Sequence, residues 1–265
     1  MNLFYPNKRT FPSISCTGTW CGLMCGHCKG FYLGNMLDAS GGRMFQICQE
    51  AKSSGALGAL LSGGSDQYGR VPFDNRDLER CLDMARFKVN LHIGLIDRLP
   101  ATYLSAKLIS VDIPSSDRVV SDVYGIKGKG RNDYFHMLDL LEDEGIRYVP
   151  HMCVGLENGV VGGEFRTLEM LESYSFEQLV ILSMKRTPRA DMTKKQINIG
   201  DYEKVLKMAR DKFKYLCLGC MRDKDQGKEK LWHYFDKIAW PSKIIKDELK
   251  ENGIAFKKCD TCCSV

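Results

Sequence analysis

Three cysteines near the start of the chain stand at a spacing that suits metal chemistry. Cys21, Cys25 and Cys28 form the pattern C-x3-C-x2-C in a short loop that also contains glycine. Three thiolates suit a [4Fe–4S] cluster that keeps one iron free of protein ligands, whereas a closed cluster or a structural zinc needs four. We therefore predict an iron–sulfur cluster with an open iron. Zinc is the alternative, with Cys16 or His27 as its fourth ligand.

The elements that must position this loop alternate regularly along the chain. Apolar runs that look buried on both faces, as parallel strands are, alternate with amphipathic helical stretches. The predicted strands are 12–15, 58–61, 89–93, 108–111, 148–152, 179–182, 215–218 and 238–240. The predicted helices are 42–53, 78–85, 132–144, 164–173, 200–212 and 242–252. About eight strand–helix units indicate an α/β fold, a (β/α)8 TIM-type barrel or a partial barrel, rather than a doubly wound sheet.

We predict one domain over residues 1–265, with 254–265 as a cysteine-rich tail that closes over the barrel mouth. Hydrophobic residues make up 44% of the chain and the net charge is only +5, which does not indicate nucleic-acid binding. No apolar run approaches the ~20 residues of a membrane span, and the N-terminus lacks the apolar core of a signal peptide. Twelve cysteines in such a chain indicate metal or redox chemistry. The sequence predicts a cytoplasmic protein.

Polar and glycine residues follow several predicted strands, at the end of a barrel where functional residues gather. The turn Ser62-Gly63-Gly64-Ser65 lets the backbone approach a ligand closely, or is a plain tight turn. Asp112 ends the fourth strand. It either accepts a hydrogen bond from a ribose hydroxyl or caps the next turn. His92 and His151, near the ends of the third and fifth strands, face either the mouth or a partner in the wall.

Six further cysteines lie at strand ends or in the tail. They are Cys153, Cys217, Cys220, Cys259, Cys262 and Cys263. Iron–sulfur clusters take up to four cysteines, so we predict that a subset of these six binds a second cluster, with zinc or free thiols as alternatives. Cys48 and Cys81 fall on apolar helix stripes and are predicted to be core residues.

Two basic loops, 127–131 and 185–189, follow the fourth and sixth strands. Each is solvated surface by default. If both lie at the mouth, they can attract an acidic carrier protein or an anionic substrate.

The cysteine loop resembles the signature of the radical S-adenosylmethionine (radical SAM) superfamily. More specifically, the chain resembles the biotin-synthase-like group that includes the subunits of the archaeal-type, two-protein lipoyl synthase. The segments that carry this resemblance are 11–18 with the cysteine loop, 61–66, 149–156, 218–222 and 262–263.

This resemblance implies that S-adenosylmethionine is cleaved at the open iron and that a 5′-deoxyadenosyl radical abstracts hydrogen from an unactivated carbon. An auxiliary [4Fe–4S] cluster would then donate sulfur to an octanoyl chain on an acidic lipoyl carrier. A related radical SAM subunit and a reductant such as ferredoxin are the implied partners. The turn 62–65 is expected to meet the methionine moiety of the cofactor, and the segment from Gly155 to Glu164 is expected to lie near its adenosine.

One feature of the resemblance is missing from this chain. Ser65-Asp66 and His92-Ile93-Gly94 stand where biotin synthase carries auxiliary-cluster cysteines, so a [2Fe–2S] site of that type is not expected. Two alternatives therefore stand beside sulfur insertion. One is radical SAM chemistry that abstracts hydrogen or rearranges carbon without inserting sulfur. The other is a zinc- or cluster-binding scaffold without catalysis.

Overall fold

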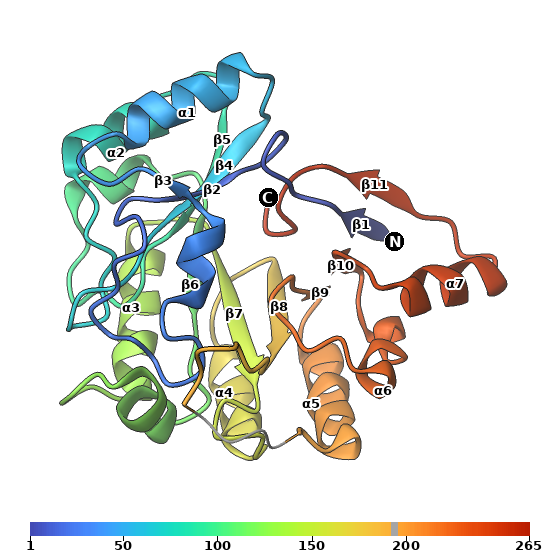
Figure 1. The fold of residues 1–265 in the computed structure, drawn as a ribbon. Helices are drawn as coiled ribbons and strands as arrows, with labels where there is room; N and C mark the ends of the chain where they lie inside the picture. Colours follow the sequence, from blue (N-terminus) through green and yellow to red (C-terminus); the bar gives the residue numbers. More distant parts are fainter. Residues whose placement is uncertain (192–195) are drawn as a thin grey trace.

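A single parallel sheet that curls into an open barrel forms the centre of the protein (Figure 1). The computed structural model describes residues 1–191 and 196–265. In chain order the strands are β1 (Asn2–Phe4), β2 (Ser13–Ser15), β3 (Leu37–Asp38), β4 (Gly58–Ser62), β5 (Lys88–His92), β6 (Ile109–Asp112), β7 (Tyr148–Val154), β8 (Gln178–Ser183), β9 (Tyr215–Leu218), β10 (Lys237–Ala239) and β11 (Lys257–Cys259). Every predicted strand is present, which confirms the α/β partial barrel; the doubly wound alternative is wrong.

The order of the strands leaves the sheet open. It runs β11-β1-β10-β9-β8-β7-β6-β5-β4-β2-β3, so the sheet ends at β3 and β11 instead of closing on itself. The partial form of the predicted barrel is therefore the one found. Strand β1 was not predicted, and it inserts between β10 and β11 at the opposite end of the sheet from β2, the next strand in the chain.

Helices cover the outer face of the sheet (Figure 1). The α-helices are α1 (Met44–Ser53), α2 (Asn75–Leu82), α3 (Arg131–Asp143), α4 (Gly163–Leu171), α5 (Ile199–Lys212), α6 (Gln226–Glu229) and α7 (Lys243–Glu251). Short helices are η1 (Phe31–Asn35), η2 (Ala101–Ser105), the π-helical η3 (Val119–Tyr124) and η4 (Trp232–Tyr234). Over residues 93–108, all of which the structure describes, the only helix is η2, so the third predicted unit lacks its α-helix.

The two faces of the sheet pack against different partners. Along β8, Leu179 and Ile181 belong to the large core between sheet and helices. The alternating residues Val180 and Leu182 belong to a smaller cluster that also contains Cys217. Since side chains alternate between the faces of a strand, this smaller cluster is the inner wall of the barrel.

The last residues of the chain lie against that inner wall. Strand β11 pairs with β1, and the tail then turns inward. Gln178 Nε2 donates to the carbonyl of Cys263 over 3.1 Å, and Ser264 Oγ lies 3.3 Å from His151 Nε2. The first contact is at the start of β8 and the second is in the middle of β7. The prediction that the tail covers the barrel mouth stays a prediction.

None of the helices in residues 1–191 and 196–265 has the length and hydrophobicity needed to cross a bilayer.

Candidate metal and cofactor site

The loop 21–28, called the cluster loop below, is held by segments that follow three different strands. The Gly22 N–H donates to the Ser65 carbonyl after β4, over 2.7 Å. The Gly26 N–H donates to the Val123 carbonyl in η3, which follows β6, over 2.8 Å. After β8, Thr187 Oγ1 donates to the carbonyl of Cys28 over 3.2 Å. The carboxyl end of the sheet therefore fixes the cluster loop from three sides.

The glycine turn after β4 packs directly against this loop. A Cβ on Gly64 would lie 1.9 Å from the Trp20 carbonyl oxygen and 2.6 Å from the Cα of Cys21, which no real contact allows. The Gly64 N–H donates to Thr17 Oγ1 over 2.7 Å. The close approach that requires this glycine is thus to the cluster loop itself. Contact of Ser62, Gly63, Gly64 and Ser65 with a cofactor stays a prediction.

The electrostatics of the cluster loop favour a thiolate. The thiol of Cys25 donates to Cys28, and this hydrogen bond, with further contributions from His27 and the Gly30 N–H, lowers the pKa of Cys28 to about 4 despite its burial. The same bond and the negative charges of Cys28 and Cys21 raise the pKa of Cys25. The thiolate is the form that binds metal, so the donor set and its polar surroundings fit an iron–sulfur cluster.

Within the described residues, no three His, Cys, Asp or Glu side chains converge into a ready-made metal site. This holds for the cluster loop as well as for the thiols inside the barrel. The three loop cysteines are close enough to interact in other ways: Cys25 is hydrogen-bonded to Cys28, and the negative charge of Cys21 acts on Cys25.

Asp112, a predicted cofactor residue, forms a pair with His92 at the strand ends. Asp112 Oδ2 lies 3.4 Å from His92 Nε2. Burial opposes the charge on each side chain, but their mutual attraction prevails: it raises the pKa of His92 and lowers the pKa of Asp112. The His151 ring stands edge-on to His92 at 6.1 Å, and burial, with the positive charge of His92, lowers the pKa of His151 to about 4. A polar row thus links β5, β6 and β7.

The segment after β7 is braced by one buried carboxylate. Glu164 is 1% exposed, and its two oxygens accept from the N–H groups of Gly155, over 2.8 Å, and Gly162, over 2.9 Å. Gly155 has a left-handed backbone with φ of 79°. Glu164 therefore fixes the shape of this segment. Whether Gly155 and Glu164 also lie near adenosine stays a prediction.

Five of the six thiols predicted for a second cluster lie along the inner wall of the barrel, whereas Cys220 is an exposed residue in the loop after β9. Cys217 and Cys263 belong to the inner cluster, with Cys153 and Cys259 packed against it. Cys262 accepts from Asn90 Nδ2 over 3.6 Å. Burial, and then the charge of Cys262, raises the pKa of Cys220 to about 11.

Hydrogen bonds connect the thiols of the tail. Cys263 donates to Cys217 and accepts from Cys262, and the pKa of both tail thiols lies well above its ordinary value. They are protonated in these surroundings, so a bound metal would have to displace their protons. The type and number of donors fit a second thiolate cluster.

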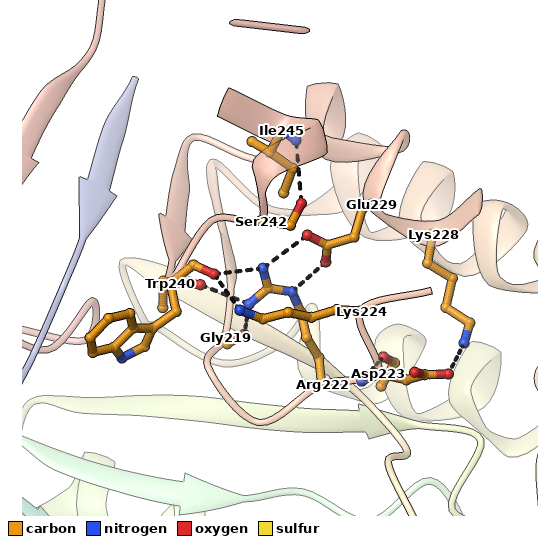
Figure 2. Close-up of polar contacts among 11 residues, drawn as sticks. Gly219, Arg222, Asp223, Lys224, Lys228, Glu229, Trp240, Ser242 and Ile245 are labelled. Carbon is orange, nitrogen blue, oxygen red and sulfur yellow. Dashed lines mark hydrogen bonds and ion pairs between the residues drawn. The ribbon is translucent and has the colours of Figure 1, made fainter. Parts of the chain in front are cut away.

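A buried ion pair fixes the segment that carries Cys220 (Figure 2). Arg222 and Glu229 have side chains that are each 1% exposed, and Arg222 Nε donates to Glu229 Oε1 over 2.7 Å. Arg222 Nη1 also donates to the carbonyls of Gly219 and Ala239, both over 2.7 Å. The pair therefore joins the carboxyl ends of β9 and β10 to α6.

Sequence reasoning did not single out Tyr32, in η1. Burial raises the pKa of its hydroxyl to about 12, and the negative charges of Cys153, Cys28 and Cys220 add to the shift. Tyr32 is therefore near enough to Cys28 of the cluster loop and to Cys153 and Cys220 for their charges to act on its hydroxyl. Its position four residues after Cys28 was the only signal in the sequence.

The two basic loops have different surroundings. In 127–131, Lys129 pairs with Asp133 over 2.8 Å, and Arg131 donates to the Ser115 carbonyl over 3.1 Å. The other loop, 185–189, contributes Thr187 to the cluster loop, and Asp191 beyond it forms an ion pair with Lys29. Part of this basic charge is thus used within the fold.

Solved structures share this architecture. Methylornithine synthase (PylB) matches with a TM-score of 0.61 and 14% identity, over 91% of this chain and 73% of that one. Streptococcus suis SuiB bound to precursor peptide SuiA matches with a TM-score of 0.57 and 14% identity, over 94% of this chain and 54% of that one. SuiB bound to S-adenosylmethionine matches with a TM-score of 0.53 and 12% identity, over 95% of this chain and 51% of that one. The chain thus spans about half the length of SuiB.

No protein-family model matches the sequence, and no match was found among curated proteins. The likeness to solved structures therefore establishes the fold.

Proposed function

We propose that this chain is a radical SAM enzyme whose cluster is bound by Cys21, Cys25 and Cys28. The observation that carries the proposal is a C-x3-C-x2-C loop held from three strand ends at the carboxyl end of a parallel partial barrel. Its fold is also that of SuiB, which was solved with S-adenosylmethionine. When bound, the cluster and S-adenosylmethionine supply a 5′-deoxyadenosyl radical that abstracts hydrogen from an unactivated carbon.

The residues of the chain have distinct tasks in this proposal. Cys28 offers a thiolate, and Thr17 and Gly64 hold the turn after β4 against the loop. The barrel wall excludes water from the substrate carbon. We assign Ser62, Gly63, Gly64 and Ser65 to the methionine moiety, and Asp112, His151, Gly155 and Glu164 to the nucleoside side of the cofactor.

Formation of 5′-deoxyadenosine tests this proposal. The protein is reconstituted anaerobically with iron and sulfide and then incubated with S-adenosylmethionine and dithionite. Wild type should release 5′-deoxyadenosine, and alanine at any of Cys21, Cys25 or Cys28 should abolish it. Cys48→Ala, which removes a thiol buried between α1 and α2, is the control and should remain active. A fully loaded cluster that releases no 5′-deoxyadenosine would favour the scaffold alternative.

The finer proposal is sulfur insertion of the lipoyl-synthase type, on an octanoyl chain carried by an acidic lipoyl domain. Its support is the group of thiols inside the barrel, where Cys217, Cys262 and Cys263 are hydrogen-bonded in series. Sulfide from an auxiliary cluster on these thiols would be the inserted atom. A related radical SAM subunit and a ferredoxin-like reductant in the cytoplasm are the proposed partners.

Iron content separates sulfur insertion from the other radical reactions. Two [4Fe–4S] clusters give about eight irons per chain, and one gives about four. The triple variant Cys220→Ser, Cys262→Ser, Cys263→Ser should fall from about eight to about four and still cleave S-adenosylmethionine. A wild-type count near four that the triple variant leaves unchanged would rule out sulfur insertion.

A second candidate is radical chemistry without sulfur insertion, on a peptide. It is favoured by the likeness of the fold to SuiB, which was solved with a precursor peptide. The two substrates are distinguished by incubating the loaded enzyme with an octanoylated lipoyl domain. A mass gain that corresponds to sulfur supports insertion, and an unchanged mass favours the peptide.

A further inference from the structure

A cavity of about 380 Å³ lies on the outside of the barrel, between α7 and β11. Its lining is Tyr5, Lys246, Lys250, Phe256, Lys258 and Asp260. The two lysines of α7 are four residues apart and so share one face of the helix. Phe256, Lys258 and Asp260 alternate along β11 and its flanks and so share one face of the strand. The cavity is therefore a groove between a helix and an edge strand, built by residues outside the cluster loop.

The charge of this groove is unbalanced. It contains three lysines and one aspartate. Among the residues that the structure describes, none of the three lysines forms an ion pair, although thirteen such pairs occur elsewhere. Lys224, which donates to the Trp240 carbonyl, is close enough to Lys246 for their charges to repel. The groove thus attracts anions, while Tyr5 and Phe256 give it apolar walls.

Strand β11, which forms one wall of the groove, also has an open edge, because it is the last strand of the sheet. The Lys257 N–H donates to Met1, and the Cys259 carbonyl accepts from Tyr5, so both residues bond toward β1. Alternate residues of a strand bond in opposite directions, so the N–H and C=O of Lys258 point to the open edge of the sheet. An extended peptide can bond to such an edge while its side chains enter neighbouring pockets.

From these three observations we propose that the groove between α7 and β11 binds an acidic, extended peptide segment. The segment would bond to the backbone of Lys258 and place carboxylates against Lys246, Lys250 and Lys258. The purpose of such a groove would be the docking of a protein or peptide partner, and in this respect the inference rests on the proposed function. Peptide binding is measured without S-adenosylmethionine, however, so failure of one proposal is distinguishable from failure of the other.

Fluorescence anisotropy with a labelled peptide of alternating glutamate and serine tests the groove on the full chain. The triple variant Lys246→Gln, Lys250→Gln, Lys258→Gln should bind it about tenfold more weakly than wild type, because three surface ion pairs are lost. The matched control is Lys88→Gln, Lys107→Gln, Lys207→Gln. It removes the same charge from exposed positions elsewhere and should keep wild-type affinity. Equal losses in both triple variants would reduce the effect to net charge and overturn the proposal.

A second measurement separates a peptide from a small anion. On peptide binding, the amide of Lys258 should exchange its hydrogen more slowly, whereas tripolyphosphate should not slow it. If tripolyphosphate displaces the peptide and the Lys258 amide stays unprotected in both cases, the groove is a site for small anions and the peptide proposal is wrong. Thermal unfolding of the variants checks that each remains folded.

Discussion

At the scale of single residues, the site depends on glycines at which any side chain would displace a neighbouring atom. A Cβ on Gly64 would overlap the Trp20 carbonyl oxygen. A Cβ on Gly63 would lie 2.8 Å from Cys16 Sγ. The sequence indicated close approach at these glycines, but it could not tell a ligand from a neighbouring loop. The two segments are more than 40 residues apart, and their contact arises only in the assembled sheet.

Alanine at Gly64 should disrupt the cluster loop. Its methyl group has no room beside Trp20, so the loop must shift, which costs about 1–3 kcal/mol in unfolding free energy. We expect iron binding to fall with it. Gly34→Ala is the matched control, because a Cβ there has no neighbour within 4 Å. Thermal unfolding and iron content measure both effects, and equal behaviour of the two variants would contradict this explanation.

Arg222 offers a second test at this scale. Arg222→Met leaves the Glu229 carboxylate buried without its partner, and such a loss costs about 3–5 kcal/mol. Adding Glu229→Leu removes the unpaired charge and should recover a large part of the loss. The exposed pair Lys204–Asp201 is the comparison, where Lys204→Gln should change stability by less than about 1 kcal/mol. Urea unfolding of the three variants gives the values, and a double variant no more stable than Arg222→Met would be inconsistent with a charge effect.

At the scale of elements, the sequence predicted what has local periodicity. Eight strands and six helices lie where the spacing of apolar residues predicted them. Burial of one or two faces of an element gives a repeating apolar pattern among residues that are close in the sequence. The strands β1, β3 and β11 have only two or three residues, and β11 carries Lys257 and Lys258. Such segments become strands only through partners far away in the chain, as when β1 inserts between β10 and β11.

The site follows the same division. The spacing of Cys21, Cys25 and Cys28 is local, so their grouping was predictable. The pairing of His92 with Asp112 depends on the register between β5 and β6, where His92 lies beside Ser110. The nearness of Tyr32 to Cys28 and Cys153 depends on how distant segments of the chain assemble around η1. Neither relation leaves a pattern in the sequence.

The start of α3 provides a pH-dependent prediction for an element. Asp133 accepts from the Gly130 N–H over 2.8 Å and pairs with Lys129. Burial opposes its charge, but these contacts lower the pKa of Asp133. Because the folded pKa lies below the unfolded one, the stabilisation is present above about pH 4 and is lost as pH falls through the folded pKa.

Asp133→Ala should therefore lower the stability of the apoprotein by about 0.5–2 kcal/mol at pH 7. The difference from wild type should shrink as the pH is lowered below about 4. Thermal unfolding at a series of pH values measures it. A difference that stays constant down to pH 3 would assign the effect to helix propensity instead of charge.

At the scale of the whole molecule, β1 joins the start of the chain to its end. It pairs with β10 on one side and with β11 on the other, and β11 leads into the tail inside the barrel. The tail thiols are therefore positioned by a strand at the opposite end of the sequence.

A chain that begins at Tyr5 should release this tail. Without β1, β11 has lost its partner, so trypsin should cleave after Lys257 and Lys258 much faster than in the full chain. Cleavage after the exposed Lys107 is the internal control and should keep its rate. If the tail stays as resistant as before, the contacts of Cys262, Cys263 and Ser264 hold it without β11.

The three supports of the cluster loop also set an order of events. Residues 21–28 leave the ribosome early, but their contacts are with the turn after β4, with Val123 and with Thr187 and Asp191. Long-range contacts form late, since the chain between them must first be ordered. The loop thus reaches its final shape only after more than two thirds of the polypeptide has been synthesised and folded. For the proposed cluster, delivery of iron would accordingly be a task for a nearly complete protein, not for a nascent chain.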